Sequence, residues 1–308
     1  MDERLFHNAL SVKEGYPMRL TETQLDRYSL LSPEFAARAK CTAGVKLSFY
    51  TEAKRLSFDY EVVSWCRSTN IVDVFEDGIL TGHVRLADMQ SHGKVSILRN
   101  INGEKRIDLY LPNTCGLRIT GCDFGKYRPV HSVGEKILLL GDSILQGINS
   151  YHPSGTLSGL LLACSGVEGI NQSVGGGYYD PVFLEDTGFL PDRIIIAMGA
   201  NDADDQSEAY TERIPAWYGK LRELYPQTPA VTVTPIWGLR HTTDPDYFER
   251  VKKVAACISE NACKHDVRVI DGNGMVPHHM NFFNEDGCHP NDLGFAHYAL
   301  NFEKAIHA

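Results

Sequence analysis

The chain has 308 residues, of which 43% are hydrophobic and 22% charged, a composition typical of a folded globular protein. Its formal net charge of -9 argues against a nucleic-acid partner, because proteins that bind phosphate backbones usually carry a basic face. The sequence contains no apolar run long enough to cross a bilayer, and its N-terminus lacks the apolar core of a signal peptide. We therefore expect no membrane partner and a cytoplasmic location.

Residues 44 to about 125 form short stretches rich in Val, Ile, Phe, Tyr and Thr, separated by Gly, Asn and Asp. Several alternate apolar and polar residues, as at 46–49, which is typical of strands with one buried face. The Asp-Gly pair at 77–78 and the Asn-Gly pair at 102–103 are hairpin signals between such stretches. The pattern predicts an antiparallel β-sandwich of the jelly-roll type, in an N-terminal domain of residues 1–130. The first 45 residues carry no pattern that assigns them a role.

Residues 126–134 have few apolar side chains and are predicted to form a linker. After them, apolar runs alternate with stretches in which apolar residues recur every three or four positions, around 210–224 and 248–262. The predicted strands are 136–141, 169–171, 193–199, 230–235 and 266–271. Buried strands separated by amphipathic helices predict a parallel sheet covered on both faces, that is, a three-layer α/β domain of residues 131–308.

Polar residues follow the predicted parallel strands at their carboxyl ends, where ligands bind in open α/β sheets. They would gather a hydroxyl, glycine amides, a side-chain amide, a carboxylate and an imidazole on one rim, from Ser143, Gly175, Gly176, Asn201, Asp286 and His289.

This set of groups meets the requirements of acyl transfer. A serine hydroxyl such as that of Ser143 needs a general base, and His289 can take its proton. The base needs a carboxylate to orient it, and Asp286 lies three residues earlier. The oxyanion needs donors, which the Ser143 amide, a glycine amide within 175–177 and the Asn201 side chain could supply. The alternative is structural, with Ser143 as a helix cap and Asn201 as a turn residue.

We expect no metal and no other cofactor. The eight cysteines are scattered without a C-x-x-C pair, so they are predicted to be reduced and to pack as small hydrophobic side chains. The adjacent His278 and His279 have no acidic partner at ligand spacing, which favours a loop over a metal site. The cluster Asp202, Asp204 and Asp205 lacks the glycine and the terminal glutamate of a calcium loop, so we predict a solvated helix start.

Four short blocks resemble, in order, the four sequence blocks of the SGNH (GDSL-type) hydrolases. They are GDSI at 141–144, NQSVGG at 171–176, GAND at 199–202 and DGCHP at 286–290. Each block alone is weak, but four in order make a specific pattern. The resemblance covers roughly residues 135–308 and implies a flavodoxin-like α/β/α sandwich that hydrolyses esters without a metal.

The resemblance also implies roles for individual residues. Ser143 is the nucleophile, His289 its general base and Asp286 the third member of a catalytic triad. The amides of Ser143 and Gly176 and the side chain of Asn201 form the oxyanion hole.

Four further residues are candidates for the substrate pocket: Gly175, Tyr178, Tyr179 and Trp237. Gly175 is also the alternative to Gly176 in the oxyanion hole, because the triple glycine leaves the alignment ambiguous by one position. The three aromatic side chains either line the pocket, where they would suit a sugar, or pack between loops. The sequence leaves both alternatives open.

A β-sandwich before such a hydrolase domain is similar to the arrangement in carbohydrate esterase family 2 and related two-domain acetyl esterases. Some members of that family use a Ser-His dyad, but Asp286 at the matching position predicts a full triad here. The resemblance implies a serine esterase that removes a short acyl group, expected to be acetyl, from a carbohydrate or small polar molecule. The alternatives are a lipase or thioesterase, and a carbohydrate-binding protein with a vestigial hydrolase domain. The sequence does not indicate the oligomeric state.

Overall fold

The computed structural model describes residues 1–67, 70–86, 90–100, 102–131, 134–163 and 167–307. By their contacts, the residues divide into two compact units. The N-terminal unit consists of residues 1–134, 151–154 and 162–170, and the C-terminal unit of residues 135–150, 155–161 and 171–308. Two short segments beyond the predicted boundary at 130 thus group with the N-terminal unit.

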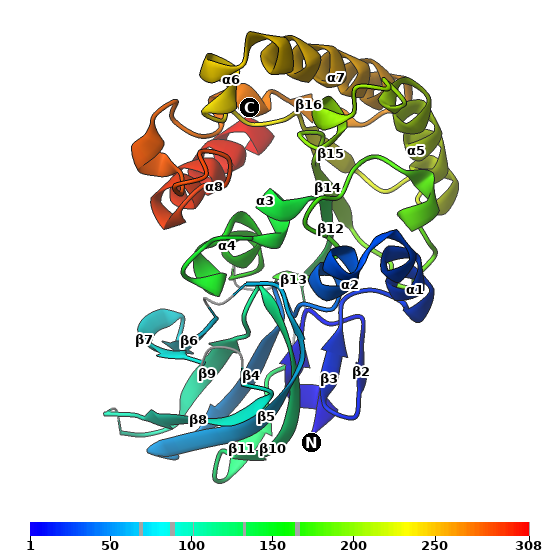
Figure 1. The fold of residues 1–308 in the computed structure, drawn as a ribbon. Coiled ribbons are helices and arrows are strands. Elements are labelled where there is room, and N and C mark those ends of the chain that lie inside the picture. The colour runs from blue at the N-terminus through cyan, green and yellow to red at the C-terminus, as the bar shows by residue number, and fades with distance from the viewer. Residues whose placement is uncertain (68–69, 87–89, 101, 132–133, 164–166, 308) are drawn as a thin grey trace. The chain divides into compact units, whose positions relative to one another are not determined.

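The N-terminal unit is built on two antiparallel β-sheets (Figure 1). Its strands are β1 (Phe6–His7), β2 (Ser11–Lys13), β3 (Tyr16–Met18), β4 (Lys46–Thr51), β5 (Arg55–Trp65), β6 (Ile71–Glu76), β7 (Ile79–Arg85), β8 (His92–Leu98), β9 (Lys105–Tyr110), β10 (Cys115–Asp123) and β11 (Tyr127–Pro129). One sheet has the order β1-β4-β9-β6-β7, with β11 also paired to β4, and the other has the order β10-β5-β8. Both sheets contribute side chains to one buried core, including Phe49 of β4 and Phe58 of β5. The predicted antiparallel N-terminal region is confirmed.

Two local predictions for this region are wrong. The Asn-Gly pair at 102–103 does not close a hairpin, because β8 and β9 lie in different sheets. Strand β9 is buried over its last four residues and pairs with β4 and β6, so the packing of its apolar faces overrides the local turn signal. The segment 126–134 is not a linker throughout, since it contains β11. By contrast, the Asp-Gly pair at 77–78 has positive φ angles of 49° and 81° and joins β6 to β7, as predicted.

The first 45 residues form a β2–β3 hairpin and two helices, α1 (Glu22–Leu31) and α2 (Pro33–Ala39). Thr21 caps α1 in a capping box with Gln24. Ser32 caps α2, whose first residue is Pro33, a position where the missing N–H costs nothing. These helix starts are encoded locally, in residues that the strand patterns do not cover.

A five-stranded sheet has the order β13-β12-β14-β15-β16, and all of its strands except β13 lie wholly in the C-terminal unit. The strands are β12 (Glu135–Gly141), β13 (Val167–Asn171), β14 (Arg193–Ala197), β15 (Ala230–Val233) and β16 (Arg268–Ile270), and β12, β14, β15 and β16 pair in parallel. The helices are α3 (Ser143–Gln146), α4 (Leu157–Ala163), α5 (Tyr210–Leu224), α6 (Arg240–Thr243), α7 (Pro245–Lys264) and α8 (Asp292–His307). Over the described chain as a whole, short 3-10 helices span Glu3–Leu5, Pro153–Gly155, Pro181–Phe183, Asp202–Asp204, Gly272–Gly274 and Met280–Phe282.

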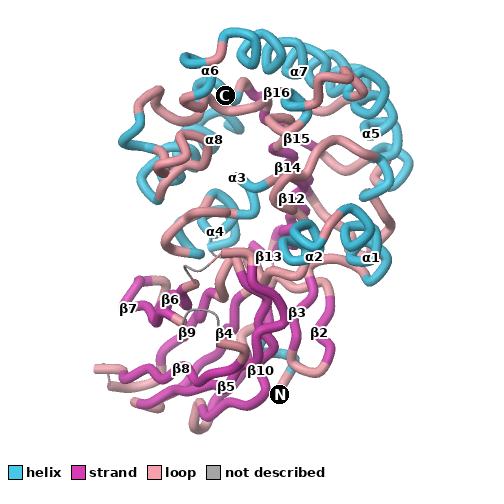
Figure 2. The backbone as a smooth tube through the Cα atoms, viewed as in Figure 1, coloured by secondary structure: helices cyan, strands magenta, loops and turns pink. Residues whose placement is uncertain are grey.

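Helices cover both faces of this sheet, with α5 and α7 on one side and α3 and α8 on the other (Figures 1 and 2). Helix α5 buries Ile214, Trp217 and Leu221, the residues whose spacing predicted it. Strand β14 buries Ile194, Ile195 and Ile196 in succession, as a strand covered on both faces requires. The predicted three-layer α/β domain is confirmed.

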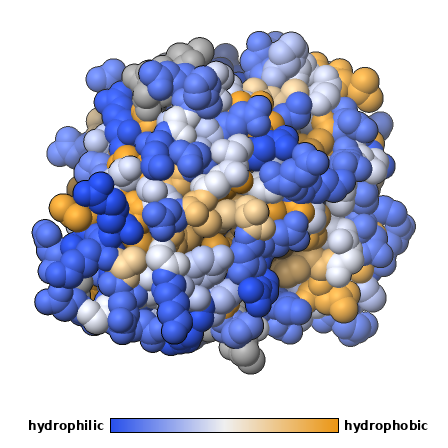
Figure 3. Space-filling model, turned by 90° about the horizontal axis from the view of Figure 1, so that it is seen from below, coloured by the Kyte–Doolittle hydropathy of each residue, from blue (hydrophilic) through white to orange (hydrophobic). Residues whose placement is uncertain are grey.

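On the face drawn in Figure 3, most residues are hydrophilic, and the hydrophobic ones lie among them. Among the described residues, single large hydrophobic side chains such as Leu30 and Leu190 are exposed, which is ordinary for a folded protein. Over the described residues, no helix is both long enough and apolar enough to cross a membrane.

Candidate active site

The turn after β12 places Ser143 at the start of a helix. Gly141 pairs with Ala197 of β14, and a Cβ on Gly141 would lie only 2.5 Å from the Ala197 carbonyl oxygen. The helix α3 then begins at Ser143, and its cap is Asp142, whose carboxylate accepts the Ile144 N–H at 3.0 Å. The helix cap is therefore Asp142, and Ser143 does not have this structural role.

Ser143, His289 and Asp286 form one chain of hydrogen bonds. His289 Nε2 lies 2.8 Å from Ser143 Oγ, and His289 Nδ1 lies 2.7 Å from Asp286 Oδ2. A carboxylate only accepts hydrogen bonds, so Nδ1 of the neutral ring carries the proton and Nε2 is left to accept from the serine hydroxyl. The structure thus brings together three residues that are 146 and 3 positions apart along the chain.

Three further donors hold the Asp286 carboxylate. Its Oδ1 accepts the backbone N–H groups of Cys288 and His289, both at 2.9 Å, and its Oδ2 accepts Nδ2 of Asn149 at 2.7 Å. Burial alone would raise the pKa of Asp286, but the hydrogen bonds from the His289 ring and from the two backbone amides outweigh it and hold the pKa well below its usual range. The carboxylate therefore stays charged and keeps the imidazole oriented.

The loop that carries Asp286 and His289 is held by the segment after β15. Gly287 has a φ of +65°, and its carbonyl accepts the Leu239 N–H at 2.8 Å. A Cβ on Gly287 would lie 2.7 Å from the Cβ of Leu239, so glycine permits both the turn and the close approach. Asn284 closes the other end of the loop by donating to the carbonyl of His289 at 3.2 Å.

The glycine-rich loop after β13 lies beside the nucleophile turn. The Val174 N–H donates to the Gly141 carbonyl at 3.1 Å, and the Gly175 N–H donates to Oε1 of Gln146 at 2.6 Å. Gly176 follows with a φ of +81°, a conformation that favours glycine. Asn201 reaches the same loop, with its Nδ2 2.8 Å from the carbonyl oxygen of Gly177.

Two carboxyl groups behind the site are buried. Both oxygens of Asp202 lie 3.3 Å from the Tyr179 N–H, and Oδ1 lies 3.5 Å from the Arg213 guanidinium. Burial raises the pKa of Asp202 to about 7 and that of Asp142 to about 6. The prediction of a solvated helix start is wrong for Asp202, because its carboxyl satisfies a backbone donor in the interior, although Asp204 is exposed as predicted.

The aromatic pocket candidates differ in their surroundings. The prediction that Tyr179 lines the pocket is wrong. Its side chain is fully buried, its ring packs on that of Trp217 with the centroids 5.1 Å apart, and its hydroxyl lies 3.3 Å from that of Tyr218. Tyr178 is half-buried, with the Arg213 guanidinium 4.8 Å from its ring centroid.

Trp237 remains a candidate for the pocket wall. It is 7% exposed, stacks on His278 at 5.1 Å and meets Phe283 edge to face at 5.2 Å. It lies two residues before Leu239, which anchors the loop of Asp286 and His289.

Sequence reasoning missed two residues that support the site, Gln146 and Asn149. Both follow the nucleophile closely, three and six residues after Ser143. Asn149 has a φ of +66°, and asparagine tolerates this left-handed conformation better than most residues. The signal for Gln146 is a fully buried polar side chain within an apolar helix start, which a sequence shows only after its burial is known.

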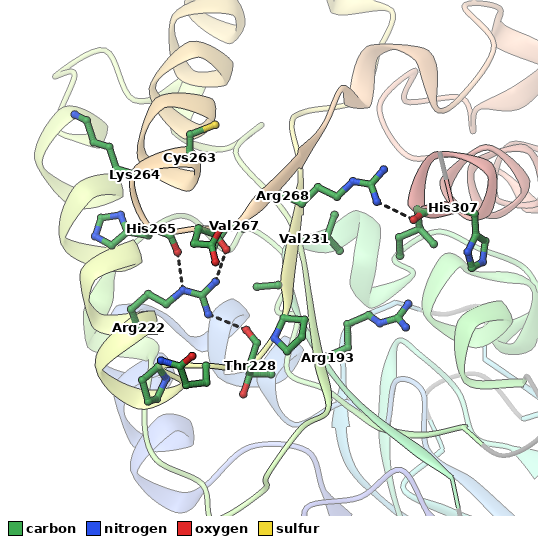
Figure 4. A pocket seen from close by; sticks show the side chains of 16 residues that line it. Arg193, Arg222, Thr228, Val231, Cys263, Lys264, His265, Val267, Arg268 and His307 are labelled. Carbon is green, nitrogen blue, oxygen red and sulfur yellow. Dashed lines mark hydrogen bonds between the residues drawn. The ribbon is translucent and has the colours of Figure 1, made fainter.

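A cavity of about 1140 Å³ lies at the opposite edge of the sheet, near the first residues of β14, β15 and β16 (Figure 4). Two of its arginines, Arg222 and Arg268, are engaged with backbone carbonyls, as Figure 4 shows, and the third, Arg193, pairs with Glu135 at 2.8 Å. Arg222 donates to the carbonyls of His265 and Thr228 at 2.7 and 2.8 Å, and Arg268 donates to that of Ile306 at 2.8 Å. The guanidinium groups of Arg222 and Arg268 supply hydrogen-bond donors to backbone carbonyls at the ends of neighbouring segments. These arginines therefore have a structural role at the cavity.

The described residues contain no group of three or more His, Cys, Asp or Glu side chains that could hold a metal ion. The chemistry of the hydrogen-bonded chain depends on an imidazole base and a serine hydroxyl, both of which the chain itself supplies.

A family model described as "GDSL-like Lipase/Acylhydrolase family" matches residues 139–297. No curated protein sequence matches the chain. Among solved structures, the chain is similar to a salicylyl-acyltransferase, SsfX3, from a tetracycline biosynthetic pathway, at 23% identity over 98% of this chain and 93% of that chain with a TM-score of 0.79. It is also similar to a putative GDSL-like lipase from Bacteroides ovatus, at 21% identity over 99% and 95% of the two chains with a TM-score of 0.79.

A family two carbohydrate esterase from Cellvibrio japonicus matches at 17% identity over 86% of this chain and 89% of that chain, with a TM-score of 0.63. At such identities, what these structures share with this chain is the fold. The similarity extends over both compact units in each case.

Proposed function

Since the chain belongs to the GDSL-like lipase/acylhydrolase family, we propose that it is a serine esterase with Ser143 as nucleophile, acting on short-chain acyl esters. The observation that carries the proposal is the chain of hydrogen bonds from Asp286 through His289 to Ser143, with distances of 2.7 and 2.8 Å. A serine hydroxyl in such an arrangement can lose its proton to the imidazole as it attacks a carbonyl carbon.

In the first half of the reaction, Ser143 Oγ bonds to the carbonyl carbon while its proton moves to His289 Nε2. The tetrahedral intermediate then breaks its bond to the alcohol oxygen, which takes the proton from His289 and leaves. In the second half, water attacks the acyl-serine, and His289 again accepts and returns the proton, so the acid is released and Ser143 is restored. Asp286 stays ionised and stabilises the imidazolium that forms twice per turnover.

Three donors would stabilise the oxyanion: the Ser143 amide, the Gly176 amide and Nδ2 of Asn201. Ser143 is the first residue of α3, so its N–H has no acceptor within the helix. Gly176 is preferred to Gly175 because the Gly175 N–H is already bound to Gln146. Asn201 uses one amide hydrogen for the Gly177 carbonyl, which leaves the other for the oxyanion.

The choice of a short acyl group, with acetyl as the expected one, is supported by the similarity in fold to an acetyl xylan esterase from the rumen bacterium Butyrivibrio proteoclasticus, at 17% identity with a TM-score of 0.60. A longer acyl chain, as a lipase would require, is the alternative that a panel of esters of increasing chain length distinguishes.

The choice of a carbohydrate or another small polar molecule as the alcohol part is supported by the similarity in fold to the family two carbohydrate esterase. The fold of the salicylyl-acyltransferase supports a variant of the same chemistry, in which an alcohol instead of water accepts the acyl group. Both reactions share the acyl-serine, so they differ only in the molecule that resolves it.

A panel of p-nitrophenyl acetate, butyrate and octanoate tests the proposal, followed by product analysis on acetylated sugars. We expect the highest kcat/KM on acetate and a loss of several orders of magnitude in kcat for Ser143→Ala, while Ser29→Ala, a change at an exposed serine, serves as the control with full activity. A preference for octanoate would contradict the short acyl group. Activity of Ser143→Ala near that of the wild type would contradict the mechanism.

A further inference from the structure

Three cysteines of the N-terminal unit converge at one end of β10. Cys41 lies between α2 and β4, Cys66 follows the last residue of β5, and Cys115 is the first residue of β10. The Thr42 N–H donates to the Cys115 carbonyl at 3.0 Å, and the Cys66 N–H donates to the Thr114 carbonyl at 2.9 Å. The backbone segments that carry Cys41 and Cys66 are therefore both fixed to the same strand end.

The thiols of Cys41 and Cys66 lie close enough to interact, with Cys41 as the donor toward Cys66. The Cys41 side chain is buried, and its Sγ also lies 3.3 Å from the Ala37 carbonyl oxygen. Ser64 donates to that same carbonyl at 2.6 Å and so ties β5 to α2 beside the two sulfurs. Cys66 is partly exposed. Both cysteines therefore lie at the junction of α2, β5 and β10, and the sulfur of Cys66 is within reach of solvent.

The two thiols differ in their electrostatic surroundings. The hydrogen bond from Cys41 and the positive charges of Arg67 and Arg38 outweigh burial and lower the pKa of Cys66. Burial and the neighbouring Cys66 thiolate raise the pKa of Cys41. Thiolates attack disulfides and thiols do not, so Cys66 is the attacking sulfur and Cys41 the resolving one.

We propose that Cys41 and Cys66 are a redox-active pair that closes to an intramolecular disulfide when the protein meets a small disulfide such as oxidised glutathione. The Cys66 thiolate attacks one sulfur of oxidised glutathione, which forms a mixed disulfide and releases one glutathione thiolate. Cys41 then loses its proton to solvent, and its sulfur attacks Sγ of Cys66 and displaces the second glutathione. The two protein thiols are oxidised to one disulfide, and the oxidant is reduced to two glutathione thiols.

The bond would join the end of α2 to the end of β5 and close a loop that contains β4 and β5. Closing a loop restricts the unfolded chain, so the disulfide raises resistance to unfolding. The thermal stability of the protein then depends on the redox potential of its surroundings. The pair lies outside the proposed triad, so it adds a property to this chain that does not rest on the esterase proposal.

Oxidation of the full chain by oxidised glutathione tests the pair. After incubation, free thiols are alkylated, the protein is digested without reduction, and the peptides are identified by mass spectrometry. We expect a peptide linked through Cys41 and Cys66, no linked peptide for Cys66→Ser, and a mixed disulfide trapped on Cys66 for Cys41→Ser. The matched control Cys263→Ser, a change at an exposed cysteine of the other unit, should leave the linked peptide unchanged.

A second measurement distinguishes reactivity from folding. Circular dichroism verifies that the cysteine variants are folded, and the rate of alkylation by iodoacetamide is then followed against pH. Cys66 should react at a lower pH than Cys263 in the wild type, and Cys41→Ala, which removes the donor to the Cys66 sulfur, should shift the Cys66 profile to higher pH. Reduced Cys66 in a large excess of oxidised glutathione, or a linkage to Cys115 in place of Cys41, would overturn the proposal.

Discussion

Replacing Asp202 by asparagine should make the stability of the protein less dependent on pH. The Asp202 carboxyl is fully buried, and burial raises its pKa to about 7 from the ordinary value of 3.8. Between these two values the folded state holds a proton that the unfolded state has released. The free energy of unfolding therefore falls as the pH rises from about 4 to about 7, because ionisation of the buried carboxyl opposes folding.

The size of the effect follows from the difference between the two pKa values. Roughly three units at about 1.4 kcal/mol per unit give about 4 kcal/mol at pH 8, where the carboxyl is charged in both states. Asparagine has nearly the same shape, stays neutral and keeps an oxygen that can accept the Tyr179 N–H. Arg213 loses its contact with Asp202 but keeps Asp205, whose carboxylate lies 2.9 Å away.

We expect Asp202→Asn to unfold with a free energy within about 1 kcal/mol of the wild type near pH 4.5, and to be the more stable protein at pH 8 by up to about 4 kcal/mol. Urea unfolding followed by circular dichroism at several pH values between 4.5 and 8 measures the difference. Asp204→Asn changes an exposed aspartate of the same 3-10 helix and is the control whose pH dependence should match the wild type. A variant destabilised equally at every pH would refute the reasoning, because it would mean that Asp202 is charged and paired with Arg213 throughout.

Three predictions concern the site itself. Asn149→Ala removes one donor from Asp286 but leaves the two backbone amides, so kcat on p-nitrophenyl acetate should fall about tenfold with KM unchanged. Asn149→Asp should lower kcat further, because it places a second negative charge beside Asp286. Equal losses of kcat in the two variants would contradict this. Gln146→Ala leaves the Gly175 N–H without its acceptor and should lower the free energy of unfolding by about 1–3 kcal/mol in urea titrations, whereas unchanged stability would exclude that bond. Asp286→Asn should lower kcat by a factor of about 10² to 10⁴ in steady-state assays, since asparagine cannot stabilise the imidazolium of His289, and a change in KM alone would argue against a triad.

The catalytic unit was largely predictable because its strands are buried on both faces. Each of the predicted parallel strands is present, and the polar residues that follow them come together as expected at Ser143, Asn201 and the loop with His289. Because the carboxyl ends of parallel strands meet at one edge of the sheet, the position of the site follows from the positions of the strands. Those positions can be predicted from continuous apolar runs in the sequence.

The failures arose where tertiary packing decides the outcome. The Asn-Gly pair at 102–103 has the composition of a hairpin turn, yet the strands on either side belong to different sheets. Tyr179 and Tyr178 are adjacent and chemically identical, but only the former is fully buried in the core. Asp202 lies in an acidic stretch that suggests solvent, and its burial depends on the Tyr179 amide from a distant loop. No pattern of spacing distinguishes these alternatives.

Covalent labelling by a fluorophosphonate tests the central claim most directly, because the probe reacts with a serine that an adjacent base has activated. We predict one adduct, on Ser143, which is absent from Ser143→Ala and forms far more slowly in His289→Ala, while the Ser29→Ala control is labelled like the wild type. An adduct on another serine, such as Ser154, whose hydroxyl lies 2.6 Å from Asp73 in the N-terminal unit, or no adduct on the folded protein, would contradict it.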